Sequence, residues 1–554
     1  MGFPKALVKA LVLILPAVLW GTKGQESAHA LFMMQSQSIE EALSRYEEFS
    51  GQHGHDFDLL QRMGQIFFAQ GIQSEDPDDF VMTLFGAGLS GSTGSLEILE
   101  RGLYSGDPQL QMIALHFIAK TDDDRVTDLL SRAMTSPFLS TRMEAAYYMS
   151  QKKHPHAVGQ IEGLMVRLPP FFRPFFPSLF ALIGTSDATA SLRRLLDDLD
   201  PQVRIESILN IAKLGRDDLL PVLRKRLTQH FGPELEACVF AMGALKDSQS
   251  IPKLKRLALS PMDNVKIAAI LTLYELGERS FVEELEKMAL KKNLFAIAAL
   301  SHIPSSGDTL AELIFSDNLQ VRINAGVSLA HLRDPRCLDA VKEILVRDSR
   351  DIAFCPFPSP GRTIGIWKAV PSAELRSKDT TCDLSLSLSM REQLLIELAH
   401  LDQEKFVELV RSLFQSRQLD LIPTAIALLE NLRTPEAIGL LKEGSEKMTS
   451  PLIRDYCHLS LYRLKEEGPY EEAVKLWVMR QKDADLIRLR PILPWKVRLE
   501  SDFVLTAEET SRLLIDSFVA IASSRNIDFL LRAIRQGNPH NRYALFGLLM
   551  RATE

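Results

Sequence analysis

The most regular feature of the chain is an apolar position that recurs every 31 residues. Leucine or isoleucine occupies it seven times in succession, at Leu99, Leu130, Ile161, Leu192, Leu223, Leu254 and Leu285. Stacked helix pairs need such a spacing, because each pair places one equivalent side chain against the next pair. The pattern therefore predicts an all-α fold, an α-solenoid (superhelix) whose repeat unit is a pair of helices about 31 residues long.

Turn residues mark out the same unit. Asp200-Pro201 separates an apolar helical pattern at 190–196 from another at 203–209, and Asp followed by Pro supplies a helix N-cap and first helical residue. Comparable dipeptides stand at Asp107-Pro108, Ser136-Pro137, Ser260-Pro261 and Ser450-Pro451. Within each unit, a short break separates the first helix from the second, at Leu214-Gly215, Leu245-Lys246 and Leu276-Gly277.

The periodicity divides the chain into segments. We expect helices over 39–50 and 56–72 at one end, over 391–401 and 405–414 after an interruption, and near 507–522 and 526–536 at the other end. The expected segments are a signal peptide (1–30), an N-terminal helical cap (31–75), the repeat array (76–348), an irregular insertion (349–388), further repeats (389–488) and a C-terminal helical cap (489–554).

Two stretches of the array resemble a known repeat. Asp200-Pro201-Gln202-Val203-Arg204 and 318–325 (Asn-Leu-Gln-Val-Arg-Ile-Asn-Ala) resemble the D-P-x-V-R-x-x-A signature of HEAT repeats, and the short period is similar to the HEAT-like repeats first named for phycobilin lyases. The resemblance covers roughly 76–348 and, more loosely, 388–480. It implies a scaffold used mainly for binding, with Arg204 and Arg322 tying adjacent repeats together and the second helices lining the concave face.

Composition narrows the function classes. The chain has 554 residues, 46% hydrophobic residues and a formal net charge of −7. This excludes a disordered chain and argues against a protein that is basic overall and coats nucleic acid. We expect a protein partner and no nucleic acid.

The N-terminus has the pattern of a secretory signal. Lys5 and Lys9 precede an apolar stretch from Ala10 to Trp20, and Ala28-His29-Ala30 forms an A-x-A cleavage pattern. We expect export to a bacterial periplasm or cell envelope, with cleavage after Ala30. The alternative is an uncleaved signal that anchors the chain. No later segment is long and apolar enough to predict a transmembrane helix.

The insertion at 349–388 breaks the periodicity with prolines and glycines, and residues 363–370 are compatible with a short hairpin. Long irregular loops inside repeat arrays are often functional, which makes Arg362, Trp367 and Lys368 candidate binding residues. The alternative is a tolerated surface insertion. Cys355 and Cys382 lie in the same segment and form either a disulfide or two free thiols.

A row of cations follows the recurring leucines. One or two positions after four successive anchors stand Arg193, Arg194, Arg224, Lys225, Lys255, Arg256 and Lys287, here called the basic ladder. Cations spaced by one repeat would follow an extended acidic partner, such as an acidic protein segment, an anionic lipid or a polysaccharide, and raise its rate of association. The alternative is a solvated helix face, whose charge nearby acidic residues cancel.

Other motifs carry weaker signals. The glycines of Gly86-x-Gly88-x-x-Gly91 lack the strand that a dinucleotide site requires, and His53 and His55 fit an exposed loop better than a metal site. Phe171, Phe172, Phe175 and Phe176 are expected in the core. The sequence predicts no metal, no cofactor and no catalytic residue.

These observations predict a non-catalytic scaffold or binding protein of the cell envelope, whose solenoid surface engages a macromolecular partner. Two alternatives remain: an accessory protein or lyase-like enzyme built on HEAT-like repeats, and a self-assembling structural subunit. The sequence leaves the oligomeric state open.

Overall fold

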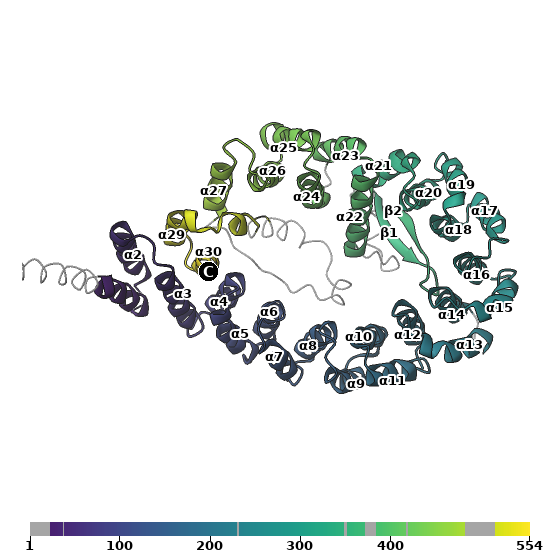
Figure 1. Ribbon diagram of the computed structural model, residues 1–554, viewed down its shortest axis with the longest axis horizontal. Coiled ribbons are helices and arrows are strands. Elements are labelled where there is room, and N and C mark those ends of the chain that lie inside the picture. Colours follow the sequence, from purple (N-terminus) through teal and green to yellow (C-terminus); the bar gives the residue numbers. More distant parts are fainter. Residues whose placement is uncertain are drawn as a thin grey trace, which may run out of the picture. The chain divides into compact units, whose positions relative to one another are not determined.

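The computed structural model describes residues 23–36, 38–229, 232–347, 352–371, 384–416, 419–481, 513 and 516–554. These residues are mainly helical, as the period predicts (Figure 1). They form two compact units. The first contains the described residues up to Ala145 and those from Glu467 onward, and the second contains those from Ala146 to Glu466.

Helix α8 (Leu139–Gln151) spans the boundary between the units. The other α-helices of the first unit are α2 (Ile39–His53), α3 (Phe57–Gly71), α4 (Pro77–Ser90), α5 (Leu96–Leu103), α6 (Pro108–Ile118), α7 (Val126–Ala133), α27 (Tyr470–Gln481), α29 (Ile527–Gln536) and α30 (Asn541–Thr553).

The second unit contains a longer series of helix pairs. Its first helices and second helices alternate along the chain: α9 (Ala157–Arg167), α10 (Phe176–Ile183), α11 (Ser186–Leu195), α12 (Pro201–Lys213), α13 (Leu220–Gln229), α14 (Gly232–Ala244), α15 (Ile251–Leu257), α16 (Asp263–Glu275), α17 (Val282–Leu290), α18 (Leu294–Ala299), α19 (Gly307–Leu313), α20 (Leu319–His331) and α21 (Leu338–Val346), then α22 (Leu384–Leu401), α23 (Gln403–Gln415), α24 (Ile422–Leu432), α25 (Pro435–Lys447) and α26 (Pro451–Arg463).

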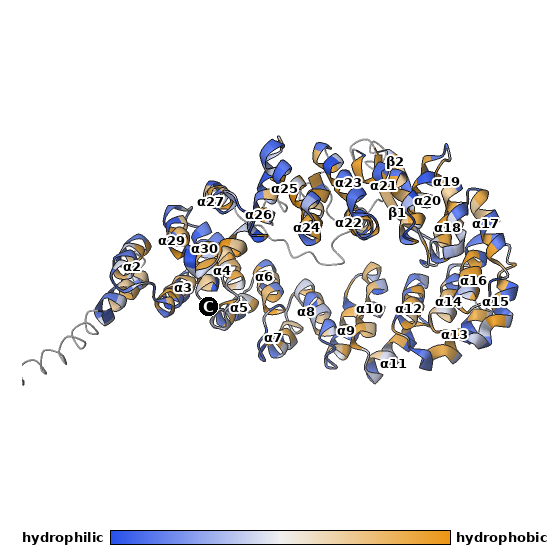
Figure 2. Ribbon diagram, turned by 45° about the horizontal axis from the view of Figure 1, so that its top comes forward, coloured by the Kyte–Doolittle hydropathy of each residue, from blue (hydrophilic) through white to orange (hydrophobic). Residues whose placement is uncertain are grey.

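The recurring leucines anchor the second helix of each pair. All seven are at most 2% exposed. Side chains also bond one repeat to the next at nearly the same sequence spacing: the Thr272 hydroxyl donates to the Val239 carbonyl (3.0 Å) and the Ser328 hydroxyl to the Ile297 carbonyl (3.1 Å). The helices carry both hydrophobic and hydrophilic residues (Figure 2), as expected where one face packs on neighbours. The predicted α-solenoid is confirmed.

The N-caps follow the turn signals in part. Asp107 and Asp200 accept hydrogen bonds from the backbone N–H two residues later and start α6 and α12 at the following proline. Of the three serine-proline dipeptides, Ser450-Pro451 starts α26 at its proline, as expected, and the other two differ. Helix α8 begins at Leu139 rather than after Ser136, and α16 begins at Asp263 rather than after Ser260, because these prolines stay in the preceding turn.

The motif arginines tie repeats together, as the resemblance implies. Arg204 donates to the carbonyls of Asp198 (2.8 Å) and Leu199 (3.1 Å) and pairs with Glu234 in the next repeat (2.9 Å). Arg322 repeats the arrangement with the carbonyls six and five residues before it and with Glu343. Each arginine bonds the backbone of the turn that precedes its helix. Arg204 also contacts the following repeat, whereas Glu343 lies on the second helix of the pair that contains Arg322.

The insertion contains an antiparallel hairpin. Strand β1 (Ile352–Pro358) pairs with β2 (Gly365–Pro371), with Phe354 opposite Ala369 and Pro356 opposite Trp367. The expected hairpin at 363–370 thus covers only the turn and second strand. The hairpin packs on the first helices α18 and α20 and on α22 (Figure 1).

The C-terminal helices pack on the N-terminal helices of the first unit. Helix α30, which the sequence analysis missed, lies against α3 and α4. A Cβ added at Gly86 would lie 2.2 Å from the Tyr543 carbonyl oxygen, and one at Gly547 2.1 Å from the Gly86 carbonyl oxygen. The two helices therefore cross with their backbones in direct contact. This explains Gly86 of the glycine motif, and Gly88 similarly faces the Phe117 ring.

This contact differs from the expectation of two separate caps at 31–75 and 489–554. It arises because α30 is apolar nearly all round, with Ala544, Phe546, Leu548 and Leu549 all buried. Such a helix lacks the one-sided period by which amphipathic helices are found in a sequence.

Residues 23–35 also form a helix that packs on the first unit. Ala30 and Met34 are fully buried, Glu26 pairs with His53 (3.2 Å) and Lys23 with Asp56 (3.4 Å). The expected cleavage after Ala30 falls inside this packed helix, and whether the chain is cleaved there or keeps an uncleaved signal as an anchor stays a prediction. None of the described helices combines the length and apolar character that a membrane crossing requires.

Candidate binding surface

The basic ladder lies on the second helices α11, α13, α15 and α17. Figure 1 shows these helices on the side of the second unit away from the hairpin, and α12, α14, α18 and α20 on the hairpin side. One short hairpin reaches from Glu206 on α12 to Asn324 on α20, so the first helices form the inner row. The expectation that the second helices line the concave face is wrong for this unit.

Four ladder residues are ion-paired. Arg224 forms two bonds to the Asp247 carboxylate (2.8 and 2.6 Å), Lys255 pairs with Glu278 (2.9 Å) and Lys287 with Glu283 (2.8 Å). Arg194 pairs with Glu162 of the preceding repeat.

The Arg224 guanidinium holds the pKa of the buried Asp247 carboxyl below its usual range. Arg224 and Lys255 each reach the break of the following repeat, where Asp247 and Glu278 occupy positions 31 residues apart. These two pairs therefore join repeats, and the ladder is not a continuous positive row.

The other three residues of the basic ladder have no ion-pair partner among the described residues. Arg193, Lys225 and Arg256 are exposed, and no carboxylate oxygen of the described residues lies within 4.0 Å of their charged nitrogen atoms. We call them the free cations. They lie on three successive second helices, α11, α13 and α15. Whether the ladder binds a partner stays a prediction, but it now concerns these three residues.

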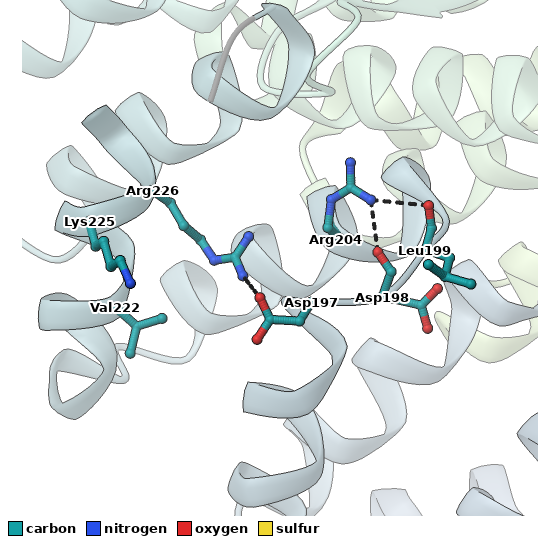
Figure 3. A pocket seen from close by; sticks show the side chains of 7 residues that line it. All are labelled: Asp197, Asp198, Leu199, Arg204, Val222, Lys225 and Arg226. Carbon is teal, nitrogen blue, oxygen red and sulfur yellow. Dashed lines mark hydrogen bonds and ion pairs between the residues drawn. The ribbon is translucent and has the colours of Figure 1, made fainter. Parts of the chain in front are cut away.

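A cleft of about 450 Å³ opens beside one free cation (Figure 3). Asp197 accepts from Arg226, Asp198 accepts from Arg173 (2.6 Å), and Arg204 donates to the backbone there. The cleft is lined by Asp197, Asp198, Leu199, Arg204, Val222, Lys225 and Arg226. Its charged walls hold the two repeats together, whereas Lys225 and Leu199, which is 94% exposed, face solvent.

The insertion residues serve packing. Arg362 pairs with Glu206 (2.6 Å), Trp367 is 3% exposed, and the Lys368 ammonium lies 3.4 Å from the centre of the Phe357 ring. The Trp367 side chain is buried within the unit, and the binding role of the three insertion residues stays a prediction.

Glu236 on α14 is the main hairpin contact that the sequence analysis missed. Its buried carboxylate accepts from the Gly361 N–H (2.9 Å) and the hydroxyls of Thr363 (2.6 Å) and Ser359. Asn324 on α20 adds two bonds of 2.8 Å to the Trp367 backbone. The sequence signal for these contacts is that Glu236 and Asn324 occupy positions of first helices where an apolar residue is expected.

Cys355 is buried and disulfide-bonded. Cys382, its expected partner, lies outside the described residues, so the pairing stays a prediction. Cys238, Cys337 and Cys457 are buried free thiols.

The histidines of the sequence analysis do not form one ligand set. His53 pairs with Glu26 and His55 with Asp528 (3.4 Å). Asp76, Asp79 and His540 form a different cluster, where the Nδ1 of His540 lies 3.0 Å from Asp79. The sequence separation of these groups hid the cluster, and its contacts join α30 to α4. Of the phenylalanine patch, Phe176 is buried but Phe171 is 66% exposed, so the expectation of core packing is wrong for Phe171.

No known family and no curated protein matches the chain. Among solved structures, the chain is similar to the complex of CpcE and CpcF of phycocyanin lyase from Nostoc sp. (20% identity, 39% of this chain and 91% of that one, TM-score 0.29). It is also similar to a karyopherin bound to the extreme C-terminus of a protein phosphatase (14% identity, 92% and 64%, TM-score 0.38). The chain thus spans less than two thirds of that karyopherin. These likenesses concern the stacking of helices, and we draw no functional argument from them.

Proposed function

We propose that this chain is a non-catalytic scaffold that binds an acidic segment of a protein partner through the second helices of its second unit. The observation that carries the proposal is the set of free cations, Arg193, Lys225 and Arg256. Arg194, Arg224 and Lys255 pair with acidic residues of neighbouring repeats, and Lys287 pairs with Glu283 on its own helix. The three free cations are exposed to solvent at a spacing of one repeat.

The burial of three thiols and of His116 supports a non-catalytic role for these groups. Burial raises the pKa of the Cys238 and Cys337 thiols to about 12 and raises that of Cys457 as well, which keeps them protonated. Burial also lowers the pKa of His116 to about 4. Such groups are poor nucleophiles and poor acids near neutral pH.

We further propose that the protein is exported to the cell envelope. The basic and apolar pattern of the N-terminus supports this, as does the disulfide-bonded Cys355, because disulfides persist in oxidising compartments. The lyase-like enzyme and the self-assembling subunit gain no specific observation from the described residues.

The test is capture of cross-linked partners from envelope extract by the full chain. The test variant is Arg193→Glu/Lys225→Glu/Arg256→Glu. The control variant, Lys152→Glu/Lys213→Glu/Lys246→Glu, has the same net charge and changes exposed cations at the breaks between first and second helices. We expect one protein to be held by the native chain and the control and lost by the test variant. Equal capture by all three folded proteins would overturn the proposal.

A further inference from the structure

Exposed apolar side chains line one edge of the second unit. Val166, Leu199, Leu259, Leu290 and Phe315, here called the apolar edge, are between 45% and 94% exposed. Each stands at or just after the end of a second helix, before the next first helix begins. The equivalent turn after α13 includes residues 230 and 231, which lie outside the described residues.

The opposite edge differs. Among the described residues of this unit, the large apolar side chains exposed near the breaks between first and second helices are Leu182 and Leu214, at 39% and 42%. Single exposed apolar residues are normal on any surface, but chance would scatter them over both edges. Their alignment along one edge, at or just after the ends of α9, α11, α15, α17 and α19, points to a contact surface.

Unpaired cations accompany the apolar edge. Lys225 lines the same cleft as Leu199, and Arg256 lies one helical turn before Leu259. Lys291 follows Leu290, is exposed and has no carboxylate within 4.0 Å among the described residues. The edge therefore alternates apolar and positively charged groups.

Polar contacts hold consecutive turns of this edge in place. Arg173 bonds Asp198 (2.6 Å) and Arg226 bonds Asp197. Further along, the Asn293 amide donates to Asp263 (3.0 Å). A surface fixed in this way loses little conformational entropy when a ligand binds.

We propose that the apolar edge binds an extended protein segment in which an apolar residue recurs every third position between acidic residues. Stacked helix pairs are about 10 Å apart, which matches one turn of a polyproline II chain, because its three residues span about 9 Å and every third side chain lies on the same side. The charge of the flanking cations selects acidic residues. A lipid surface fits less well, because the apolar residues are separated by a repeat and form no broad insertion face. The inference rests on the proposed function and names its surface and ligand.

The probes are two labelled peptides of about 15 residues, long enough to cross several repeats. Both contain only glutamate and leucine in equal composition. One has leucine at every third position, and the other has its leucines grouped at one end. Binding to the full chain is measured by fluorescence anisotropy. The test variant is Leu259→Ser/Leu290→Ser, and the control is Leu214→Ser/Leu476→Ser, which changes exposed leucines elsewhere.

We expect the periodic peptide to bind about tenfold or more tightly than the grouped one, and the test variant alone to lose that advantage. Equal binding of both peptides that is lost in the free-cation variant would overturn the apolar edge while leaving the proposed function intact. Absence of peptide binding would also overturn it. Binding of anionic lipid vesicles but not of peptide would overturn the proposal and assign the edge to a membrane. Self-association of the native chain that is lost in the test variant would overturn it and assign the edge to a second copy of the chain.

Discussion

Individual side chains of this protein divide into those that join repeats and those that are free to bind. The sequence identifies the ladder but not this division, because Asp247 and Glu278 lie 23 residues after Arg224 and Lys255 and reach them only through the stacking of helix pairs. Likewise, the cleft next to Leu199 depends on Arg226 and Asp197 meeting across two repeats. The cations could be predicted from sequence, and their partners could not.

We expect Asp247→Asn to lower the free energy of unfolding at pH 7 by roughly 2–3 kcal/mol, because it leaves a half-buried guanidinium without its counter-ion. The pKa of Asp247 is lowered in the folded state, so its contribution is present at neutral pH and is lost as pH falls below about 4. The difference between variant and native chain should therefore shrink in acid.

Denaturant titrations at several pH values measure this difference in the free energy of unfolding between Asp247→Asn and the native chain. The matched control is Asp218→Asn, which breaks an exposed pair with Arg216 and should cost about 0–1 kcal/mol. Equal effects of both substitutions would show that the Arg224 pair does not join repeats.

Substitution by alanine should change the stability of the protein in opposite directions at two glycines. Gly163 lies in α9 with no atom within 4 Å of an added Cβ, so Gly163→Ala should stabilise by about 0.5–1 kcal/mol. Gly86→Ala should destabilise by about 1–3 kcal/mol or more, because its Cβ would meet the backbone of α30. Thermal unfolding distinguishes them, and a neutral Gly86→Ala would argue against the close crossing of α4 and α30.

At the scale of elements, local patterns succeed where a helix is amphipathic and fail where it is not. The period predicts α2, α3 and the paired helices of the array within a few residues. It misses α30, which is buried all round, and it treats the insertion as irregular although its hairpin is held by a buried carboxylate. A polar residue at an expected apolar position, such as Glu236, marks one end of such a contact, but its distant partner cannot be identified from a local pattern.

The hairpin should depend on Glu236. In Glu236→Gln, an amide N–H faces donors that the carboxylate accepted from, so we expect cleavage by protease within 352–371 to accelerate about tenfold or more. Glu206→Gln breaks only the Arg362 pair at the rim and should have a smaller effect. Unchanged cleavage in Glu236→Gln would contradict the assigned anchoring role.

The helix at 23–35 predicts that the mature chain keeps these residues. Cleavage after Ala30 would remove the partners of Asp56 and His53 and expose the side chains that the helix covers. The intact mass of the protein isolated from its own cells measures this, and a mature chain that begins at Leu31 would contradict it.

At the scale of the molecule, a helical-repeat array offers a long surface with little need for any single dominant residue. In the second unit, the first helices form the inner row and contact the hairpin. The second helices carry the free cations and the apolar edge, through which we propose that the chain contacts a partner. The central claim is that this row, and not the opposite edge, meets another protein.

Site-specific photocross-linking in cells that produce the protein tests this claim most directly. A photoreactive residue replaces Lys225 or Arg256 in turn, and Lys213 or Lys246 serves as the matched exposed position at the other edge. The account predicts the same discrete protein adduct from Lys225 and Arg256 and none from Lys213 or Lys246. Adducts from Lys213 and Lys246 alone, or no adduct from either free cation, would contradict it.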